Sequence, residues 1–444
     1  MMYSRRKGGL FPWLGFFLFF LLASPAFAQK EELPPQGKPL TLEQCTAMAL
    51  KYHPSLRANQ ATIEASKARV EQALANYYPQ VSFNTGYTNS TSNLSVLGGQ
   101  TRAGTNSWTF YDFFSIGPSL SVNLYDFGRT ANTVKINREN VKASEEDLTT
   151  AKQLVVLNVK QSYFGVLQNL RLIQLAEEVV KQDQQRLEQA QGFYQAGTRP
   201  KIDVTNAEVV LANAELSLIR AKNNYKVARV TLNNAMGLRE SLSFAIEDSL
   251  GFKPVQVTLE EILNLSYSQR PELLQLKARQ RSLEASIKLA QSSYYPTLYG
   301  NASYLYRGDQ VDNLYWDFSV GATLSIPLFS GFSSPNQVAE ARANLRNLQA
   351  QEENLKLNIR LEAEQAFLGL NEADELIQVT EKTVSQAQEN FDLARGRYQV
   401  GVGSPLEITD AEVTLANARA NNIQALYDYK VAEARIEKAM GKVR

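Results

Sequence analysis

Histidine and cysteine, which supply many catalytic bases, nucleophiles and metal ligands, each occur once in this chain of 444 residues, at His53 and Cys45. His53 precedes Pro54, where a junction between helices is expected, and Cys45 follows a helix start, where a small apolar side chain is expected to be buried. A hydrolase needs a base beside its nucleophile, and a metal site needs several ligands. The sequence therefore predicts no enzyme, no catalytic residue, no cofactor and no metal site.

Carboxylates are the chemical groups that the sequence places together, beside two turns at about 196–202 and 400–405. Glu407 and Asp410 lie three residues apart on one helix face, and Asp203 holds the position of Glu407 in an internal repeat. Two interpretations of Glu407 remain open. It completes the capping box Ser404-Pro405-Leu406-Glu407, and it also brings negative charge to the turn.

The chain is an internal duplication, because two groups of motifs return, each at one constant spacing. The first group comprises Thr41-Leu42-Glu43, Pro54 and Tyr77-Tyr78-Pro79, which return as Thr258-Leu259-Glu260, Pro271 and Tyr294-Tyr295-Pro296. The second comprises Tyr194-Gln195, Gly197 and Ala207-Glu208-Val209, which return as Tyr398-Gln399, Gly401 and Ala411-Glu412-Val413. We therefore expect two repeats of similar architecture, at 54–256 and 257–444, with the extra residues of the first copy in a surface loop.

Long helices are expected in both repeats. Threonine caps at Thr41 and Thr258 lead into short helices that end at the Tyr-Tyr-Pro motifs, because proline stops a helix. The segments from 129 to about 195 and from 335 to about 399 keep the apolar spacing of coiled-coil-like helices about 100 Å long. After each glycine turn the chain reverses into a further helix, at 203–236 and 405–440. Two short helices placed end to end would then have nearly the length of one long helix.

Between the helices, apolar residues alternate with small or polar ones, as in a strand with one apolar face. The apolar set includes Val81, Phe83, Phe114, Ile116, Phe318 and Val320, and the other set includes Ser82, Asn84, Ser115, Gly117, Ser319 and Gly321. Aromatic residues near the strand ends, among them Tyr87, Trp108, Tyr304, Tyr306 and Trp316, match the outer-membrane barrel pattern. Two hairpins, at about 80–125 and 297–328, cannot close a barrel. Because open edges in hydrocarbon leave backbone groups unpaired, copies of the chain must share the barrel, with eight strands from two copies or twelve from three.

The first 28 residues have the pattern of a secretory signal peptide, with Arg5-Arg6-Lys7, an apolar run from Leu10 to Leu22 and the cleavage motif Ala26-Phe27-Ala28. We therefore expect the mature chain outside the cytoplasm. The chain carries 46 Lys and Arg against 45 Asp and Glu, and this near-neutral charge gives no support for nucleic-acid binding.

The chain resembles the TolC family of outer-membrane efflux proteins over essentially all of its mature length. The resemblance rests on the duplicated Thr-Leu-Glu starts, the junctions His53-Pro54 and Arg270-Pro271, the Tyr-Tyr-Pro entries to the strands and the Tyr-x-x-Gly turns, in this order and twice. It implies a fold of helices plus transmembrane β: a homotrimer with a twelve-stranded barrel in the outer-membrane lipid of a Gram-negative bacterium. A twelve-helix periplasmic tube would continue the barrel, with residues 29–53 as an N-terminal linker and equatorial segment.

The resemblance also assigns roles at the two turns, which would lie at the periplasmic end of the tube. Glu407 and Asp410 would ring the aperture together with Asp203, while Tyr398 and Arg199 would hold the closed gate. Three chains would crowd these carboxylates, and crowded carboxylates attract cations and raise one another's pKa. The surface expected to dock a periplasmic adaptor comprises Gly197, Thr198, Gly401, Val402, Gly403 and Ser404.

The function implied is a passive, gated exit duct of a tripartite efflux system, which carries small molecules such as drugs from the periplasm to the outside. An inner-membrane pump would supply the energy, and a periplasmic adaptor would join pump and duct. The exit duct of a type I protein secretion system is one alternative, because the same tube serves both. A non-conducting structural envelope protein is an alternative from another class, since it also uses long helices but needs no lumen.

Overall fold

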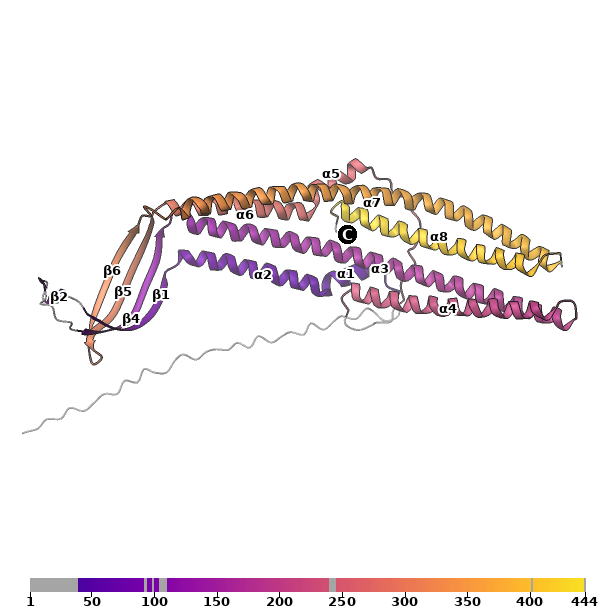
Figure 1. Cartoon of the computed structure of the whole chain (residues 1–444), viewed down its shortest axis with the longest axis horizontal. Helices are drawn as coiled ribbons and strands as arrows, with labels where there is room; N and C mark the ends of the chain where they lie inside the picture. Colours follow the sequence, from indigo (N-terminus) through magenta and orange to yellow (C-terminus); the bar gives the residue numbers. More distant parts are fainter. Residues whose placement is uncertain are drawn as a thin grey trace, which may run out of the picture. The chain divides into compact units, whose positions relative to one another are not determined.

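A computed structural model describes residues 39–91, 94–97, 100–103, 110–238, 245–400 and 402–442, which belong to one compact unit, Gly37–Arg444. The expected signal peptide, Trp108 and the turn residue Gly401 lie outside the described residues. The chain is mostly helical with a small antiparallel sheet, in agreement with the coarse fold class expected from the sequence (Figure 1).

Both repeats contain the same order of elements, as the duplicated motifs predict. The first set begins with α1 (Leu42–Tyr52), which precedes the expected repeat at 54–256, and continues with α2 (Pro54–Leu74), the 3₁₀ turn η1 (Ala75–Tyr77), β1 (Gln80–Thr91), β4 (Phe110–Tyr125), α3 (Arg129–Gln195) and α4 (Lys201–Ala235). The second comprises α5 (Leu259–Gln269), α6 (Pro271–Gln291), η2 (Ser292–Tyr294), β5 (Thr297–Gln310), β6 (Asn313–Ser325), α7 (Ser333–Gln399) and α8 (Pro405–Ala439). With 67 residues each, α3 and α7 are about 100 Å long.

The caps that the sequence predicts at the short helices form. Thr41 Oγ1 accepts a hydrogen bond from the Gln44 amide, and the Gln44 side chain accepts one from the Thr41 amide, so this capping box is complete. Thr258 caps α5 by accepting from the Glu261 amide. His53 ends α1 and begins α2, where its Nδ1 accepts from the Ser55 amide at 3.3 Å. The expectation that the only histidine is a helix-junction residue is thus confirmed.

The helices form one layer in which long and paired short helices alternate. Helices α2 and α4 both pack on α3, and α6 and α8 pack between α3 and α7 (Figure 1). Each returning helix ends in Met-Gly against a junction of short helices: a Cβ built on Gly237 would lie 2.7 Å from His53 Cα, and one on Gly441 would lie 3.0 Å from the Gln269 carbonyl carbon. Only glycine permits this approach, so the repeated Met-Gly motif allows the end-to-end stacking.

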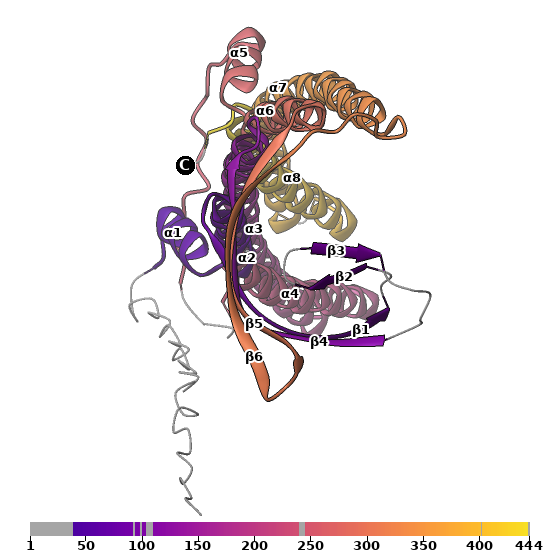
Figure 2. The same ribbon diagram turned by 90° about the vertical axis from the view of Figure 1, so that its left-hand side faces the viewer.

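Strands β1, β4, β5 and β6 form a four-stranded antiparallel sheet in the order β1-β4-β5-β6 (Figure 2). The register places the predicted apolar residues of neighbouring strands on one face, since Val81 pairs with Leu120, Leu120 with Ala302, and Ala302 with Val320. The extra residues of the first copy contain a separate hairpin, β2 (Leu94–Leu97) with β3 (Gln100–Ala103), where the sequence indicated only a loop. Among the described helices, none is both long enough and apolar enough to cross a bilayer.

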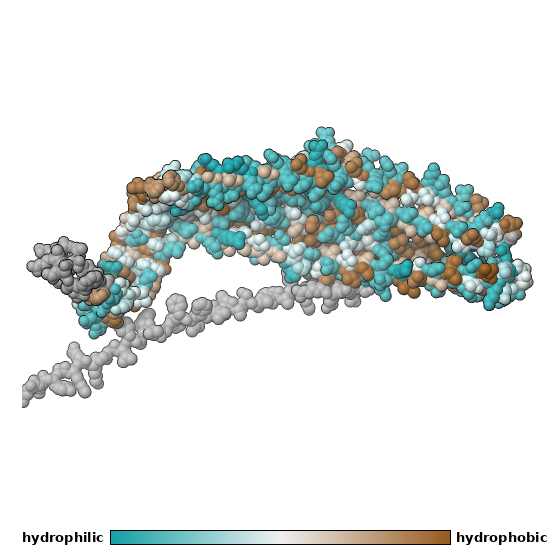
Figure 3. Space-filling model, viewed as in Figure 1, coloured by the Kyte–Doolittle hydropathy of each residue, from teal (hydrophilic) through white to brown (hydrophobic). Residues whose placement is uncertain are grey.

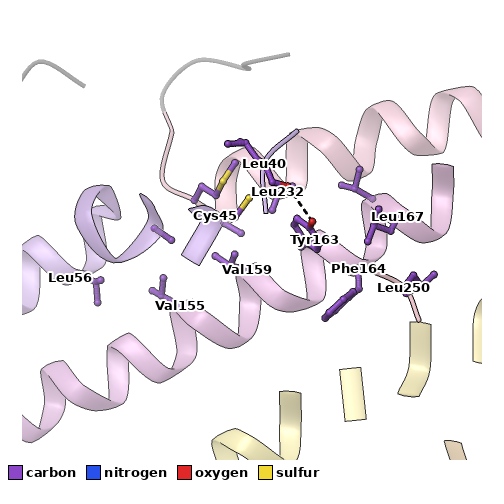
Figure 4. Packing of buried hydrophobic residues seen from close by; sticks show 14 residues of the cluster. Leu40, Cys45, Leu56, Val155, Val159, Tyr163, Phe164, Leu167, Leu232 and Leu250 are labelled. Carbon is purple, nitrogen blue, oxygen red and sulfur yellow. Dashed lines mark hydrogen bonds between the residues drawn. The ribbon is translucent and has the colours of Figure 1, made fainter. Parts of the chain in front are cut away.

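The main core lies where the N-terminal segment and the connection between repeats meet α3 (Figure 4). Leu40 and Ile246 form a parallel bridge, and the Tyr163 hydroxyl donates to the Glu247 carbonyl at 2.7 Å and to the Leu40 carbonyl at 3.2 Å. Cys45 is fully buried in the same cluster, as expected. Tyr163 therefore ties two chain segments, far apart in sequence, to the middle of α3.

Burial raises the pKa of the Cys45 thiol to about 12, so the reactive thiolate is scarce at neutral pH. We expect native protein at pH 8 to remain unlabelled by a maleimide for hours, and protein unfolded in guanidinium to be labelled within minutes. Mass spectrometry of both samples measures the difference. Rapid labelling of the native protein would contradict the burial of this side chain.

Candidate functional site

The two turns that join the long helices to the returning helices lie close together, and we call them, with the adjoining helix ends, the tip. In the first turn Gly197 has a φ of 71°, and Thr198 closes the turn by donating from its amide and its hydroxyl to the Phe193 carbonyl. In the second turn the amides of Val402 and Gly403 both donate to the Arg397 carbonyl, at 3.0 and 2.9 Å. Similar turns thus reverse both hairpins.

Gly403 permits a close backbone contact, because a Cβ built on it would lie 2.8 Å from the Tyr398 amide nitrogen. Ser404 then caps α8, as expected, by accepting from the Glu407 amide at 3.1 Å. The Glu407 carboxylate does not complete the reciprocal half of a capping box. Its Oε1 instead lies 3.0 Å from Arg397 Nε. Both interpretations of Glu407 thus hold in part: its amide is capped, and its charge lies at the turn.

The other predicted tip residues lie on both hairpins and meet at Tyr398. Asp203 forms an ion pair with Arg199 at 3.7 Å, and the Arg199 guanidinium lies 5.5 Å from the centre of the Tyr398 ring. Tyr398 is buried and packs edge-to-face on Phe193. Asp410 is exposed. The structure therefore brings Asp203, Arg199 and Tyr398 together across the two repeats and leaves both Glu407 and Asp410 solvent-accessible.

Several tip residues were missed by the sequence reasoning. They are Arg397, Phe193, the exposed apolar residues Ile202 and Leu406, and a deeper ion-pair cluster formed by Asp183, Arg186 and Glu412. Ile202 and Leu406 are repeat counterparts, so the duplication itself carried a signal for them. In the cluster, Asp183 and Arg186 lie three residues apart on α3, but no local signal pointed to Glu412, because only packing joins α3 to α8.

The ion-pair cluster lies in the contact between α3 and α8. Arg186 contacts Asp183 at 3.2 Å, pairs with Glu412 and donates to Thr409 Oγ1 at 3.2 Å; the three charged side chains are only 3–10% exposed. One guanidinium thus serves two carboxylates. Burial raises the pKa of Asp183 more than the charge of Arg186 lowers it. The cluster joins the two hairpins at a point where a charge without a partner would be costly.

The sheet supplies a second surface with functional character. Its apolar face is uncovered within the chain: Val81, Trp316 and Val320 are 68–71% exposed. On the opposite face the hydroxyls of Ser82 and Ser119 are hydrogen-bonded at 2.9 Å. Those of Ser303 and Ser319 are hydrogen-bonded at 2.8 Å, and Arg307 pairs with Asp317 at 2.8 Å. A sheet with one bare apolar face and one hydrogen-bonded polar face suits a boundary between lipid and water.

Long helical hairpins joined to such a sheet define the class of outer-membrane channel proteins. The sequence profile of the family described as outer membrane efflux protein matches residues 46–238 and 262–442, one span in each repeat. The chain belongs to this family. It is therefore an outer-membrane efflux protein, as the resemblance implied, and the family is a family of channels rather than enzymes.

Individual relatives agree with this assignment. The chain is 25% identical over 421 residues to the outer membrane protein TolC of Salmonella enteritidis, covering 90% of this chain and 82% of that protein. It is 25% identical over 413 residues to the cation efflux system protein CusC of Escherichia coli K12, covering 86% and 82%. The solved structure of the outer membrane protein VceC of Vibrio cholerae superposes with a TM-score of 0.76 at 18% identity, covering 90% of this chain and 96% of that one.

Arg186→Gln should lower the free energy of unfolding by about 3–5 kcal/mol, because two buried carboxylates lose their only cation. Asp183→Asn is the matched control and should be neutral or stabilising. Since the folded pKa of Asp183 is raised, its contribution to stability is present at low pH and is lost as the pH rises through that pKa. Urea unfolding at a series of pH values from about 4 to 8 measures both effects. Equal losses in the two variants would contradict the role of Arg186.

Proposed function

We propose that the protein is the outer-membrane exit duct of a tripartite efflux system, a passive and gated homotrimer with a twelve-stranded barrel and a twelve-helix periplasmic tube. A periplasmic adaptor binds its tip, and an inner-membrane pump supplies the energy. Family membership supports an efflux role. The names of relatives, among them cation efflux proteins and a pyoverdine export protein, favour small-molecule export over protein secretion.

One observation carries the proposal: each chain provides four strands with two unpaired outer edges, β1 and β6. Unpaired backbone groups are prohibitively costly in hydrocarbon, so the β6 edge of one copy must pair with the β1 edge of the next until the sheet closes. An eight-stranded barrel is filled by its own side chains, whereas a larger one encloses space. Three copies therefore form the smallest closed assembly with a lumen.

The outermost helices follow the order of the outermost strands. Helices α2 and α4, from the repeat that contains β1, lie on one flank of the helix layer, and α7, from the repeat that contains β6, lies on the other. Helix α3 packs between α2 and α4 on one side and α6 and α8 on the other, whereas its repeat counterpart α7, among the described helices, packs on α6 and α8 and also touches α5. Exposed apolar side chains occupy the free flanks, on α4 at Val209, Leu216 and Ile219 and on α7 at Leu361, Leu368, Val379 and Leu393. Internal pseudo-symmetry thus favours α4 of the next copy as the missing neighbour of α7.

At the tip, Glu407 and Asp410 of three chains would surround the aperture and attract cations. Asp203, Arg199 and Tyr398 would hold the hairpins in the closed arrangement. The exposed apolar residues at the turns, Val402, Leu406 and Ile202, are 64–68% exposed and extend the predicted docking surface. Figure 3 shows brown apolar patches among polar residues toward the end of the molecule that carries the tip. A periplasmic adaptor with complementary apolar helix ends suits this surface.

The decisive experiment is the oligomeric mass of detergent-extracted protein, paired with conductance of the same sample in planar bilayers. We expect a trimer that conducts ions, because only closure of the sheet satisfies β1 and β6 in lipid. A conducting dimer would contradict the twelve-stranded barrel but keep the duct. A trimer without conductance would favour the structural envelope protein.

Glu407→Gln together with Asp410→Asn should reduce the preference for cations over anions about threefold, as expected when exposed charges worth roughly 0.7 kcal/mol are lost. Reversal potentials in a salt gradient measure the preference. Glu260→Gln with Glu261→Gln removes the same charge from α5 and is the matched control. If both double variants behave like the unmodified protein, Glu407 and Asp410 do not line the aperture.

A further inference from the structure

We propose that a groove over α8, between α3 and α7, binds amphipathic organic cations on the inner wall of the duct. This inference rests on the proposed function, because that function makes the wall a path for solutes. The groove has a volume of about 340 Å³ and is far from the tip. Its lining includes Gln161 of α3, Gln365 and Glu372 of α7, and Asp428 and Arg435 of α8.

The groove has an apolar floor and a polar rim. The floor is made of small or aliphatic side chains from α7 and α8, namely Ala366, Ala373, Leu376, Val431 and Ala432, with the half-buried ring of Tyr427 beside them. Amide and charged groups stand around it. An apolar depression with a few polar groups at its edge is the usual chemistry of a small-molecule site, and the tyrosine ring can stack on a flat ligand.

Gly369 keeps the groove open. It lies in the middle of α7, where glycine costs roughly 1 kcal/mol relative to alanine, yet a Cβ there would meet no atom within 4 Å. Packing therefore does not require glycine at this position. Its repeat counterpart Gly165 also lies mid-helix, and a Cβ there would lie 3.9 Å from Tyr427 Cε2, an ordinary contact. Both helices thus lack a side chain near the same groove.

The groove lies on the side of α8 that faces away from the segments 39–53 and 245–257. A different cavity, of about 470 Å³, lies between those segments and α8 and is lined on α8 by Lys430, Glu433, Ala434 and Glu437. The groove is lined on α8 by Tyr427, Asp428, Val431, Ala432 and Arg435, which occupy the opposite side of the helix. Figure 2 shows α1 and α5 on the convex side of the curved sheet and helix layer. Closure into a tube therefore turns the groove toward the lumen.

The charges of the rim favour a cation. The charged groups of the rim are two carboxylates, Glu372 and Asp428, and one guanidinium, Arg435. Among the described residues, the Asp428 carboxylate accepts a hydrogen bond from the neutral Gln424 side chain alone, at 2.9 Å. Within the described part of the chain, Glu372 and Arg435 form no ion pair. The net charge is one negative, and a cationic ring system could also lie against the Tyr427 ring.

The test uses ethidium, a flat organic cation, titrated into the purified detergent-solubilised protein and followed by its fluorescence. Gly369→Leu should weaken binding at least tenfold, because the new side chain fills the groove. Gly192→Leu is the matched control, since Gly192 lies in the other long helix with open space around it. Unchanged binding in Gly369→Leu, or an equal loss in both variants, would overturn the site.

Charge variants test the class of ligand. Glu372→Gln and Asp428→Asn should each weaken ethidium binding about threefold, and Arg435→Gln should strengthen it about threefold, as for single exposed charges. The opposite pattern would overturn the preference for cations. Conductance of the same samples distinguishes a failure of this binding site from a failure of the proposed duct function. Protein that conducts ions but binds no ethidium would contradict the binding site and leave the duct function intact.

Discussion

The backbone of the four-stranded sheet imposes the constraint on which the rest of the molecule depends. A strand edge in lipid has no water to satisfy its amides and carbonyls, so β1 and β6 must find partners outside their own chain. The free flanks of the helix layer correspond to these edges: α2 and α4 belong to the same repeat as β1, and α7 belongs to the same repeat as β6. One closure can therefore complete both layers, and the exposed apolar residues on the sheet, α4 and α7 become contacts with lipid or with another copy.

Two kinds of packing divide the helical part. Within the second hairpin the core is apolar and often built of small side chains, as at Ala411, Leu415 and Ala418 against Ala387 and Phe391, with polar pairs such as Asn422 and Thr380 beside it. Between the hairpins, α3 meets α8 through polar pairs: Lys160 with Glu437, Gln168 with Gln424, Glu178 with Arg419, and Arg186 with Glu412. The second hairpin thus has a core of its own, and directional polar contacts join it to α3.

Much of the architecture could be read from local patterns. The Tyr-Tyr-Pro motifs, the threonine caps and the alternation around Phe83 or Phe318 are set by neighbours in sequence, and the structure places helices and strands there. The β2–β3 hairpin was missed because its alternation is short. The prediction that the Glu407 carboxylate would accept from the Ser404 amide was wrong, because Arg397, ten residues before Glu407 and on α7, attracts that carboxylate.

The sequence by itself determined the duplication, the element order, the one-sided strands and the burial of Cys45, because periodicity and caps act over a few residues. Only the tertiary structure decided the strand order, the pairing of Arg186 with Glu412, the meeting of Arg199 with Tyr398, and the groove beside Gly369. The physical reason is that these features join strands or side chains from elements that lie far apart in the sequence. Their distances depend on how α3, α7 and α8 pack, which no local pattern encodes.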